Sequence, residues 1–268
     1  MAFSARALLL STAGAILALC GRQVSAQATS PAENPQRAVA VPFIGCESFG
    51  QIERLDPPKG TSRMLAIKPK DAELLAYYES ADRIGLLAPR GWHCEGASGS
   101  GGAVLFLSPT TIERTPYGWK GLDGSAIEVN YMNGGSSGMY GIAEIIARVF
   151  PTYMALAKPV LTGMDIPIPS GPFPKDKLIY RSKKLVEYLT PARTEGLGTY
   201  QSWLKKSDLP IAGVVILIGD PPKTIANPDA PIKVPDLLLL QMRFHPDLPQ
   251  LTPVIVGYLE RQTMGTRK

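Results

Sequence analysis

Residues 211–218 read IAGVVILI, an apolar run of eight residues without a polar side chain. A run of this length is typical of a strand buried on both faces, so it is predicted to be a central strand of a sheet. Residues 237–244 (LLLLQMRF) are predicted to form another strand. Shorter strands are predicted earlier in the chain, at residues 38–45, 91–95, 103–108, 127–131, 178–181 and 185–190. In residues 127–131 apolar side chains alternate with Glu128 and Asn130, which indicates a half-buried strand.

The clearest helix lies between these strands. Ile142, Ile145, Ile146 and Val149 recur at i, i+3, i+4 and i+7, which predicts an amphipathic helix that ends before Pro151. These four side chains are expected to face the core. Three further helices are predicted: one from Asp71, with Leu74, Leu75 and Tyr78 on one face, one over residues 153–161, and one from a Thr252 cap.

The elements mix strands and helices without a regular alternation, which predicts an α+β fold, or an α/β fold, with a mixed sheet and about four helices. The 26 glycines and 25 prolines of the 268 residues indicate a loop-rich protein. No internal repeat or break in composition divides the chain. Residues 38–268 are therefore predicted to form a single domain, preceded by a polar and disordered lead-in at residues 27–37.

Residues 1–26 have the three parts of a cleavable signal peptide: Arg6, an apolar stretch over Leu8–Leu19, and small residues at Val24-Ser25-Ala26. The alternative is a lipoprotein signal ending in Cys20, although Leu19 is bulkier than the residue usual before such a cysteine. No later apolar stretch reaches the roughly 20 residues of a membrane-spanning helix. The mature protein is therefore expected in the periplasm or outside the cell, without a transmembrane segment.

Charge and cysteines limit the partners of the mature chain. Removal of the signal takes away Arg6 and Arg22 and leaves 26 basic against 23 acidic residues, a net charge of +3 that gives no reason to expect nucleic acid. Cys46 and Cys94 are the two cysteines that remain. In an oxidising compartment a pair of cysteines is predicted to form a disulfide. The sequence names no other partner, and an association with the cell envelope stays open.

Several segments resemble a group of secreted, mostly proteobacterial proteins to which no activity is assigned. The similar segments are LLAPRGWHCEGASGSGG (86–102), NGGSSGMYGIAEIIARVFP (133–151), TPARTEGLGT (190–199) and IAGVVILIGD (211–220). The resemblance covers most of the mature chain and implies a secretory signal and one globular domain. It supplies no catalytic residue.

Residues 134–138 (GGSSG) match the GxSxG pattern between a predicted strand and a predicted helix, which is the setting of a nucleophilic serine. Asp220 and His245 each follow a predicted strand, so Ser136, Asp220 and His245 occur in the chain order of α/β-hydrolases. In that hypothesis His245 takes the proton of Ser136 and Asp220 orients the imidazole. An esterase-like or amidase-like serine hydrolase is therefore one interpretation of the sequence.

The main interpretation is a non-catalytic binding or envelope-associated module. The strand before Ser136 alternates polar and apolar residues, unlike the buried strands of a hydrolase sheet, and no helix is predicted between it and the strand at 103–108. In this interpretation the glycines make a turn and a serine caps the helix. Residues 96–102 are likewise expected to be the tip of a hairpin.

No cofactor or metal site is expected. Two histidines, His93 and His245, without an HxH or HExxH spacing give no template for zinc, and no phosphate-binding glycine motif can be completed. Trp92, Trp119 and Trp203 can either pack in the core or form a platform for a sugar ring.

Overall fold

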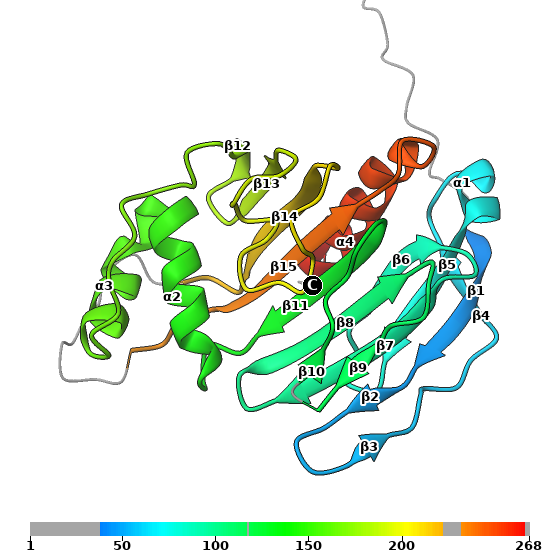
Figure 1. The fold of residues 1–268 in the computed structure, drawn as a ribbon, viewed down its shortest axis with the longest axis horizontal. Helices are drawn as coiled ribbons and strands as arrows, with labels where there is room; N and C mark the ends of the chain where they lie inside the picture. Colours follow the sequence, from blue (N-terminus) through cyan, green and yellow to red (C-terminus); the bar gives the residue numbers. More distant parts are fainter. Residues whose placement is uncertain (1–37, 117, 222–231, 266–268) are drawn as a thin grey trace, which may run out of the picture. The chain divides into compact units, whose positions relative to one another are not determined.

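A nine-stranded sheet, a four-stranded sheet and a two-stranded ribbon make up the strands of the computed structural model, which describes residues 38–116, 118–221 and 232–265 (Figure 1). Four α-helices accompany these strands in the described ranges. The large sheet pairs its strands antiparallel except where β2 runs parallel to β7, so it is mixed. The predicted α+β class is confirmed. The predicted signal peptide and the lead-in at residues 27–37 lie outside the described residues.

The predicted apolar run forms the third strand of the large sheet, counted from the edge strand β12. That run is β14, which pairs with β13 on one edge and β15 on the other. Its apolar character reflects burial on both faces, since one layer of the protein covers each face of the sheet. In spatial order the strands are β12 (Lys177–Ser182), β13 (Leu185–Thr190), β14 (Ile211–Ile218), β15 (Asp236–Arg243), β11 (Ala126–Met132), β8 (Gly102–Ser108), β7 (His93–Gly99), β2 (Ser48–Phe49) and β3 (Arg54–Leu55).

The small sheet is joined directly to the large one. Its strands in spatial order are β4 (Ser62–Leu65), β1 (Val39–Cys46), β5 (Leu75–Ser80) and β6 (Gly85–Pro89). Only Glu47 separates β1 of the small sheet from β2 of the large sheet. The predicted disulfide between Cys46 and Cys94 is present at this crossing, and it joins the end of β1 to β7.

The helix predicted from Asp71 is much shorter than expected. α1 (Pro69–Leu74) ends before Leu75, where β5 begins. All six residues of β5 are buried, and the strand pairs with β1 on one edge and β6 on the other. Pairing and burial on both sides therefore override the helical spacing of Leu74, Leu75 and Tyr78.

Two helices cover one half of one face of the large sheet (Figure 1). They are α2 (Gly138–Val149) and α3 (Met154–Thr162), connected by a 3₁₀ turn at Pro151–Tyr153. The four apolar side chains predicted to face the core from α2 are all buried. They pack against side chains from that face of the sheet, including Val215, Leu217, Leu237 and Leu239.

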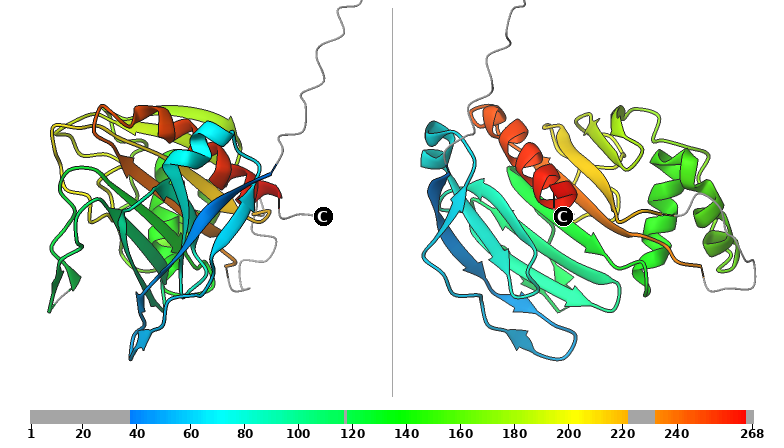
Figure 2. Two further views of the ribbon diagram at one scale, coloured as in Figure 1. Left: turned by 90° about the vertical axis from the view of Figure 1, so that its right-hand side faces the viewer. Right: turned by 180° about the vertical axis from the view of Figure 1, so that it is seen from behind.

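The opposite face of the large sheet packs against the small sheet and α4 (Thr252–Gly265). Figure 2 shows α4 along this side of the sheet, where it contacts β14 and β6. Ile255, Tyr258 and Leu259 of α4 are buried there, as the sequence predicts. The remaining strands, β9 (Arg114–Thr115) and β10 (Gly118–Trp119), form the ribbon. Within the described ranges no helix is both long and apolar enough to cross a bilayer.

Candidate functional site

The loop that carries Ser136 connects β11 to α2. The Ser136 hydroxyl donates a hydrogen bond to the Asn133 carbonyl oxygen at 3.0 Å. The residue before α2 is Ser137, and its side chain makes no capping hydrogen bond. The loop is a glycine-rich turn, as predicted. The prediction that a serine side chain caps α2 is wrong, because Ser136 bonds to Asn133 within the turn and Ser137 bonds to Ser100.

The predicted triad of Ser136, Asp220 and His245 is not assembled. Strands β11 and β15 are antiparallel, with Met132 opposite Leu237 and Ala126 opposite Arg243. Ser136 follows the first of these pairs and His245 follows the second, so the two residues lie at opposite ends of β11. The seven residues of that strand span about 20 Å at roughly 3.4 Å each, which excludes direct proton transfer.

Each of the two other predicted side chains has a different partner. His245 Nδ1 lies 2.8 Å from Asp247 Oδ1, and its backbone N–H donates to Ser125 Oγ at 2.8 Å. Lys184 Nζ donates to Asp220 Oδ1, also at 2.8 Å. The hydrolase hypothesis therefore loses the three residues on which it was based. Chain order alone could not reveal this, because β15 returns antiparallel and carries His245 away from the serine.

Two of the glycine-rich segments meet beside α2. The predicted β7–β8 hairpin is present, but its tip is shorter than residues 96–102 because β7 continues to Gly99. Ser100 lies at this tip, with its side-chain oxygen 3.1 Å from that of Ser137. The Asn133 N–H donates to the Gly101 carbonyl oxygen at 2.9 Å. A Cβ on Gly138 would lie 2.1 Å from that same carbonyl oxygen, so glycine is needed for this approach. The hairpin tip thus fixes the start of α2.

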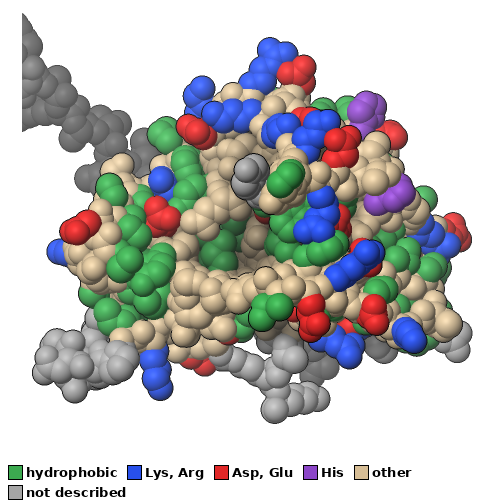
Figure 3. Space-filling view, turned by 60° about the horizontal axis from the view of Figure 1, so that its bottom comes forward, with side chains coloured by type: hydrophobic (Ala, Val, Ile, Leu, Met, Phe, Trp, Pro, Cys, Tyr) green, Lys and Arg blue, Asp and Glu red, His purple; other side chains and the backbone are tan. Residues whose placement is uncertain are grey.

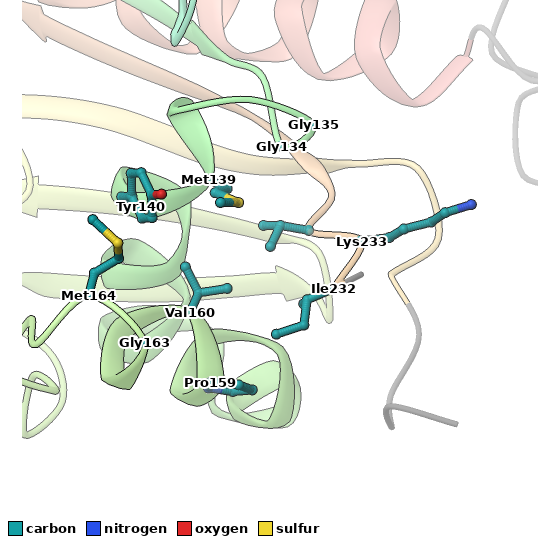
Figure 4. A pocket seen from close by; sticks show the side chains of 11 residues that line it. Gly134, Gly135, Met139, Tyr140, Pro159, Val160, Gly163, Met164, Ile232 and Lys233 are labelled. Carbon is teal, nitrogen blue, oxygen red and sulfur yellow. The ribbon is translucent and has the colours of Figure 1, made fainter. Parts of the chain in front are cut away.

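The same start of α2 borders an apolar pocket of about 770 Å³, here called the α2–α3 pocket. In Figure 4, Met139 of α2, Val160 of α3 and Ile232 face the space between them, whereas Lys233 points away from it. The described residues that line it are Gly134, Gly135, Met139, Tyr140, Pro159, Val160, Gly163, Met164, Ile232, Lys233 and Val234.

Asp236 holds two sides of this pocket together. Its carboxylate accepts hydrogen bonds from the Gly134 N–H at 2.9 Å and from the Tyr131 hydroxyl at 2.6 Å. Burial, together with this bond to Asp236, raises the pKa of Tyr131 to about 12, so the hydroxyl stays protonated and donates. A Cβ on Gly134 would lie 2.1 Å from the Val234 carbonyl oxygen. The turn and residues 232–234 can therefore approach only because position 134 is glycine.

A row of polar side chains is buried on the same face of the large sheet, where the sequence predicts only a half-buried strand. Glu128 is 1% exposed and accepts hydrogen bonds from Asn130 Nδ2, Ser202 Oγ and the Trp203 N–H, each at 2.8 Å. Burial raises the pKa of Glu128. Local sequence could not reveal this burial, because the covering loop comes from residues far along the chain.

Other predicted features take structural roles. Trp119 and Trp203 meet edge to face at 5.8 Å between ring centres, but Trp92 packs against Phe244 instead, so the three tryptophans do not form one platform. Among the described residues no group of three or more His, Cys, Asp or Glu side chains is placed to hold a metal ion. On the face shown in Figure 3, basic and acidic side chains are interspersed around a central hollow.

Comparisons of this chain with protein-family models, with curated proteins and with solved structures found no match.

Proposed function

We propose that this protein is an exported, non-catalytic binding protein that takes an apolar small molecule in the α2–α3 pocket. The observation that carries the proposal is a cavity of about 770 Å³ whose side chains are almost all apolar. Typical ligand sites are concave and mostly apolar, with volumes of roughly 300–1,000 Å³. Two methionines, Met139 and Met164, line the cavity and can adapt to ligands of different shape.

The polar groups of the pocket favour an uncharged ligand portion. Among the described residues of the lining Lys233 is the one that is charged, and its side chain points away from the cavity. The polar Asp236 is already used by Tyr131 and Gly134. A charged group placed among Met139, Val160 and Ile232 would lose hydration among apolar side chains that cannot neutralise its charge. An aliphatic or aromatic portion of a ligand meets no such cost.

Export is the second part of the proposal. The Cys46–Cys94 disulfide is compatible with an oxidising compartment, and residues 1–26 have the pattern of a cleavable signal. Intact-mass measurement of protein from the periplasm is expected to give a chain that starts at Gln27. A retained N-terminus or an acyl group on Cys20 would contradict this part.

Binding is tested by fluorescence titration of the purified mature protein with N-phenyl-1-naphthylamine, a neutral apolar probe. Replacing both Met139 and Met164 by Gln puts two polar amides into the cavity. Each lost thioether contact is worth about 1 kcal/mol, so the double variant should bind the probe at least about tenfold more weakly.

Met64→Gln is the matched control, because Met64 is similarly exposed (60%, against 53% for Met164) but lies on β4 of the small sheet. It should leave the affinity unchanged. Thermal unfolding of each variant shows that the proteins are folded. Failure of the folded wild type to bind, or equal losses in the double variant and in Met64→Gln, would refute the α2–α3 pocket as a ligand site.

A further inference from the structure

A second cavity lies between the two sheets, at the end of α4. It measures about 480 Å³ and is called the intersheet pocket here. Its apolar wall comes from four elements that are distant in the chain: Ile84 before β6, Ile218 of β14, Leu238 of β15 and Leu259 of α4. Its lining also has a cluster of ionised side chains, namely Arg63, Glu79 and Arg83, whereas the charged residue of the α2–α3 pocket, Lys233, points away from the cavity.

These three side chains form one cluster with an excess of positive charge. Arg63 Nη1 donates to Glu79 Oε2 at 3.0 Å, and Arg83 Nη1 donates to Glu79 Oε1 at 2.9 Å. The Glu79 side chain is only 8% exposed, so its two oxygens are committed to the two arginines. Two guanidinium groups and one carboxylate leave a formal charge of +1 in the cavity lining.

Each guanidinium keeps donors beyond those used on Glu79. A guanidinium has five N–H donors, and one from each arginine goes to Glu79. The Arg63 guanidinium also lies over the Tyr77 ring, at 4.0 Å from its centre, which restricts its orientation. A planar group held in this way by a ring and a carboxylate can present its other N–H groups to a carboxylate ligand with little loss of freedom.

The backbone at Arg83 is unusual in a way that supports this arrangement. Arg83 has a φ of +65°, in the left-handed region that side chains other than glycine, asparagine and aspartate seldom adopt. Its N–H donates to the Ser80 carbonyl oxygen at 3.0 Å and fixes the turn between β5 and β6. The turn therefore has a less favourable backbone conformation at Arg83. In this conformation the Arg83 guanidinium lies beside Glu79 at the cavity.

We infer that the intersheet pocket is a second binding site, for a small organic anion whose carboxylate meets Arg63 and Arg83 and whose apolar body lies against Ile84, Ile218, Leu238 and Leu259. The two pockets then differ in chemistry. The α2–α3 pocket takes an uncharged apolar group, and the intersheet pocket takes an apolar group that ends in a negative charge.

The test uses 2-naphthoate and its uncharged analogue 2-naphthylmethanol as probes of the disulfide-bonded protein. Two-dimensional NMR titration follows the amide signals of Ile84 and Gly85 at the intersheet pocket, and of Gly135 and Gly163 at the α2–α3 pocket. Naphthoate is expected to shift the first pair with saturation. The alcohol is expected to shift that pair at least about tenfold more weakly, since it lacks the charge-assisted hydrogen bonds.

Arg83→Gln and Arg63→Gln should each weaken the binding of naphthoate about tenfold or more. Arg83 is mostly exposed, so its variant is expected to fold even if the Arg63 variant does not. Arg54→Gln is the matched control, because it also breaks an ion pair of an exposed arginine, with Glu47. Equal affinity for acid and alcohol, unchanged affinity in Arg83→Gln, an equal loss in Arg54→Gln, or shifts confined to Gly135 and Gly163 would each overturn the inference.

Discussion

The two faces of the nine-stranded sheet are buried by different means. Toward the small sheet and α4 the strands present aliphatic side chains such as Val214, Ile216 and Leu240, and the contact is almost purely apolar. Toward α2 and the long loops the same strands present Leu239 and then the buried polar Gln241, next along β15 on that face. One face is therefore closed mainly by apolar packing, with the Arg63–Glu79–Arg83 cluster as a polar exception, while the other combines packing with hydrogen bonds.

The polar half of the second face forms hydrogen bonds to loops that have little secondary structure of their own. Gln241 Nε2 donates to the carbonyl oxygens of Leu197 and Tyr200, both at 3.0 Å. The buried Arg243 donates to the carbonyl oxygens of Gly124 and Lys205, and to that of Leu122 at 2.6 Å. Buried strand side chains thus hold the loops against the sheet through hydrogen bonds to loop carbonyls.

Replacing Arg243 by Leu is expected to give the largest loss of stability. The change removes three hydrogen bonds from a fully buried, charged side chain, and hydrogen bonds to charged groups are worth about 1.5–3 kcal/mol each, so the free energy of unfolding should fall by about 5 kcal/mol. Urea denaturation measures the loss. Arg181→Leu is the control, because Arg181 pairs with Glu187 at an exposed site and should cost less than about 1 kcal/mol.

If Arg243→Leu cost no more than Arg181→Leu, the second face would be held by packing alone and the contrast between the two faces would disappear.

Substitutions at Leu239 and Leu240 allow a direct comparison of the apolar parts of the two faces. They are neighbours on β15, both are fully buried, and they point to opposite sides of the sheet. Leu→Ala at either position should lower the free energy of unfolding by about 2–5 kcal/mol. Only Leu239→Ala, on the α2 side, should also weaken binding of the neutral probe. Weaker binding in Leu240→Ala as well would mean that the α2–α3 pocket depends on the whole sheet.

The Glu128→Gln variant tests the polar part of the second face through the pH dependence of the free energy of unfolding. Burial raises the pKa of Glu128, so the folded protein holds this proton at a higher pH than the unfolded chain does. The resulting stability is present below about pH 4.5, the ordinary value, and is lost as pH rises through the folded pKa. The free energy of unfolding of wild type minus that of Glu128→Gln should therefore decrease from pH 4.5 upward, until the pH exceeds the folded pKa of Glu128.

Urea titrations of both proteins at a series of pH values measure this difference. If the difference increases with pH, the hydrogen bonds from Asn130, Ser202 and Trp203 lower the pKa of Glu128 by more than burial raises it.

The smallest effects are expected for Ser136→Ala and His245→Ala. The side chains of both residues bond only locally and at exposed sites, so each change should alter the free energy of unfolding by no more than about 0.5 kcal/mol. A fluorophosphonate probe should not label Ser136 in the wild type. Labelling of Ser136 that His245→Ala abolishes would show that the two residues do meet, against the strand register observed.

The sequence predicts those elements whose environment follows from neighbours in the chain. The run at 211–218 and the spacing of Ile142, Ile145, Ile146 and Val149 report burial directly, and β14 and α2 confirm both predictions. Strand β5 was missed because its burial comes from pairing with β1 and β6.

The candidate sites were harder to predict for the same reason. Glu128 is covered by Ser202 and Trp203, more than 70 residues away, and nothing near Glu128 signals it. The α2–α3 pocket combines the start of α2, the end of α3 and residues 232–234. Arg63 and Arg83 flank Glu79 from two different elements. Both pockets combine segments that are distant in the chain, whereas the serine of the GxSxG motif, Ser136, bonds only within its own turn.

The single residue between β1 and β2 has a mechanical consequence for the intersheet pocket. Proteins that close around a ligand do so at hinges, where a few residues absorb a large backbone rotation. Here Glu47 alone separates a strand of one sheet from a strand of the other, and the Cys46–Cys94 bond ties that junction to β7. The sheets cannot swing apart at this junction. A ligand of the intersheet pocket should therefore meet a preformed opening, and a domain movement should not limit its rate of association.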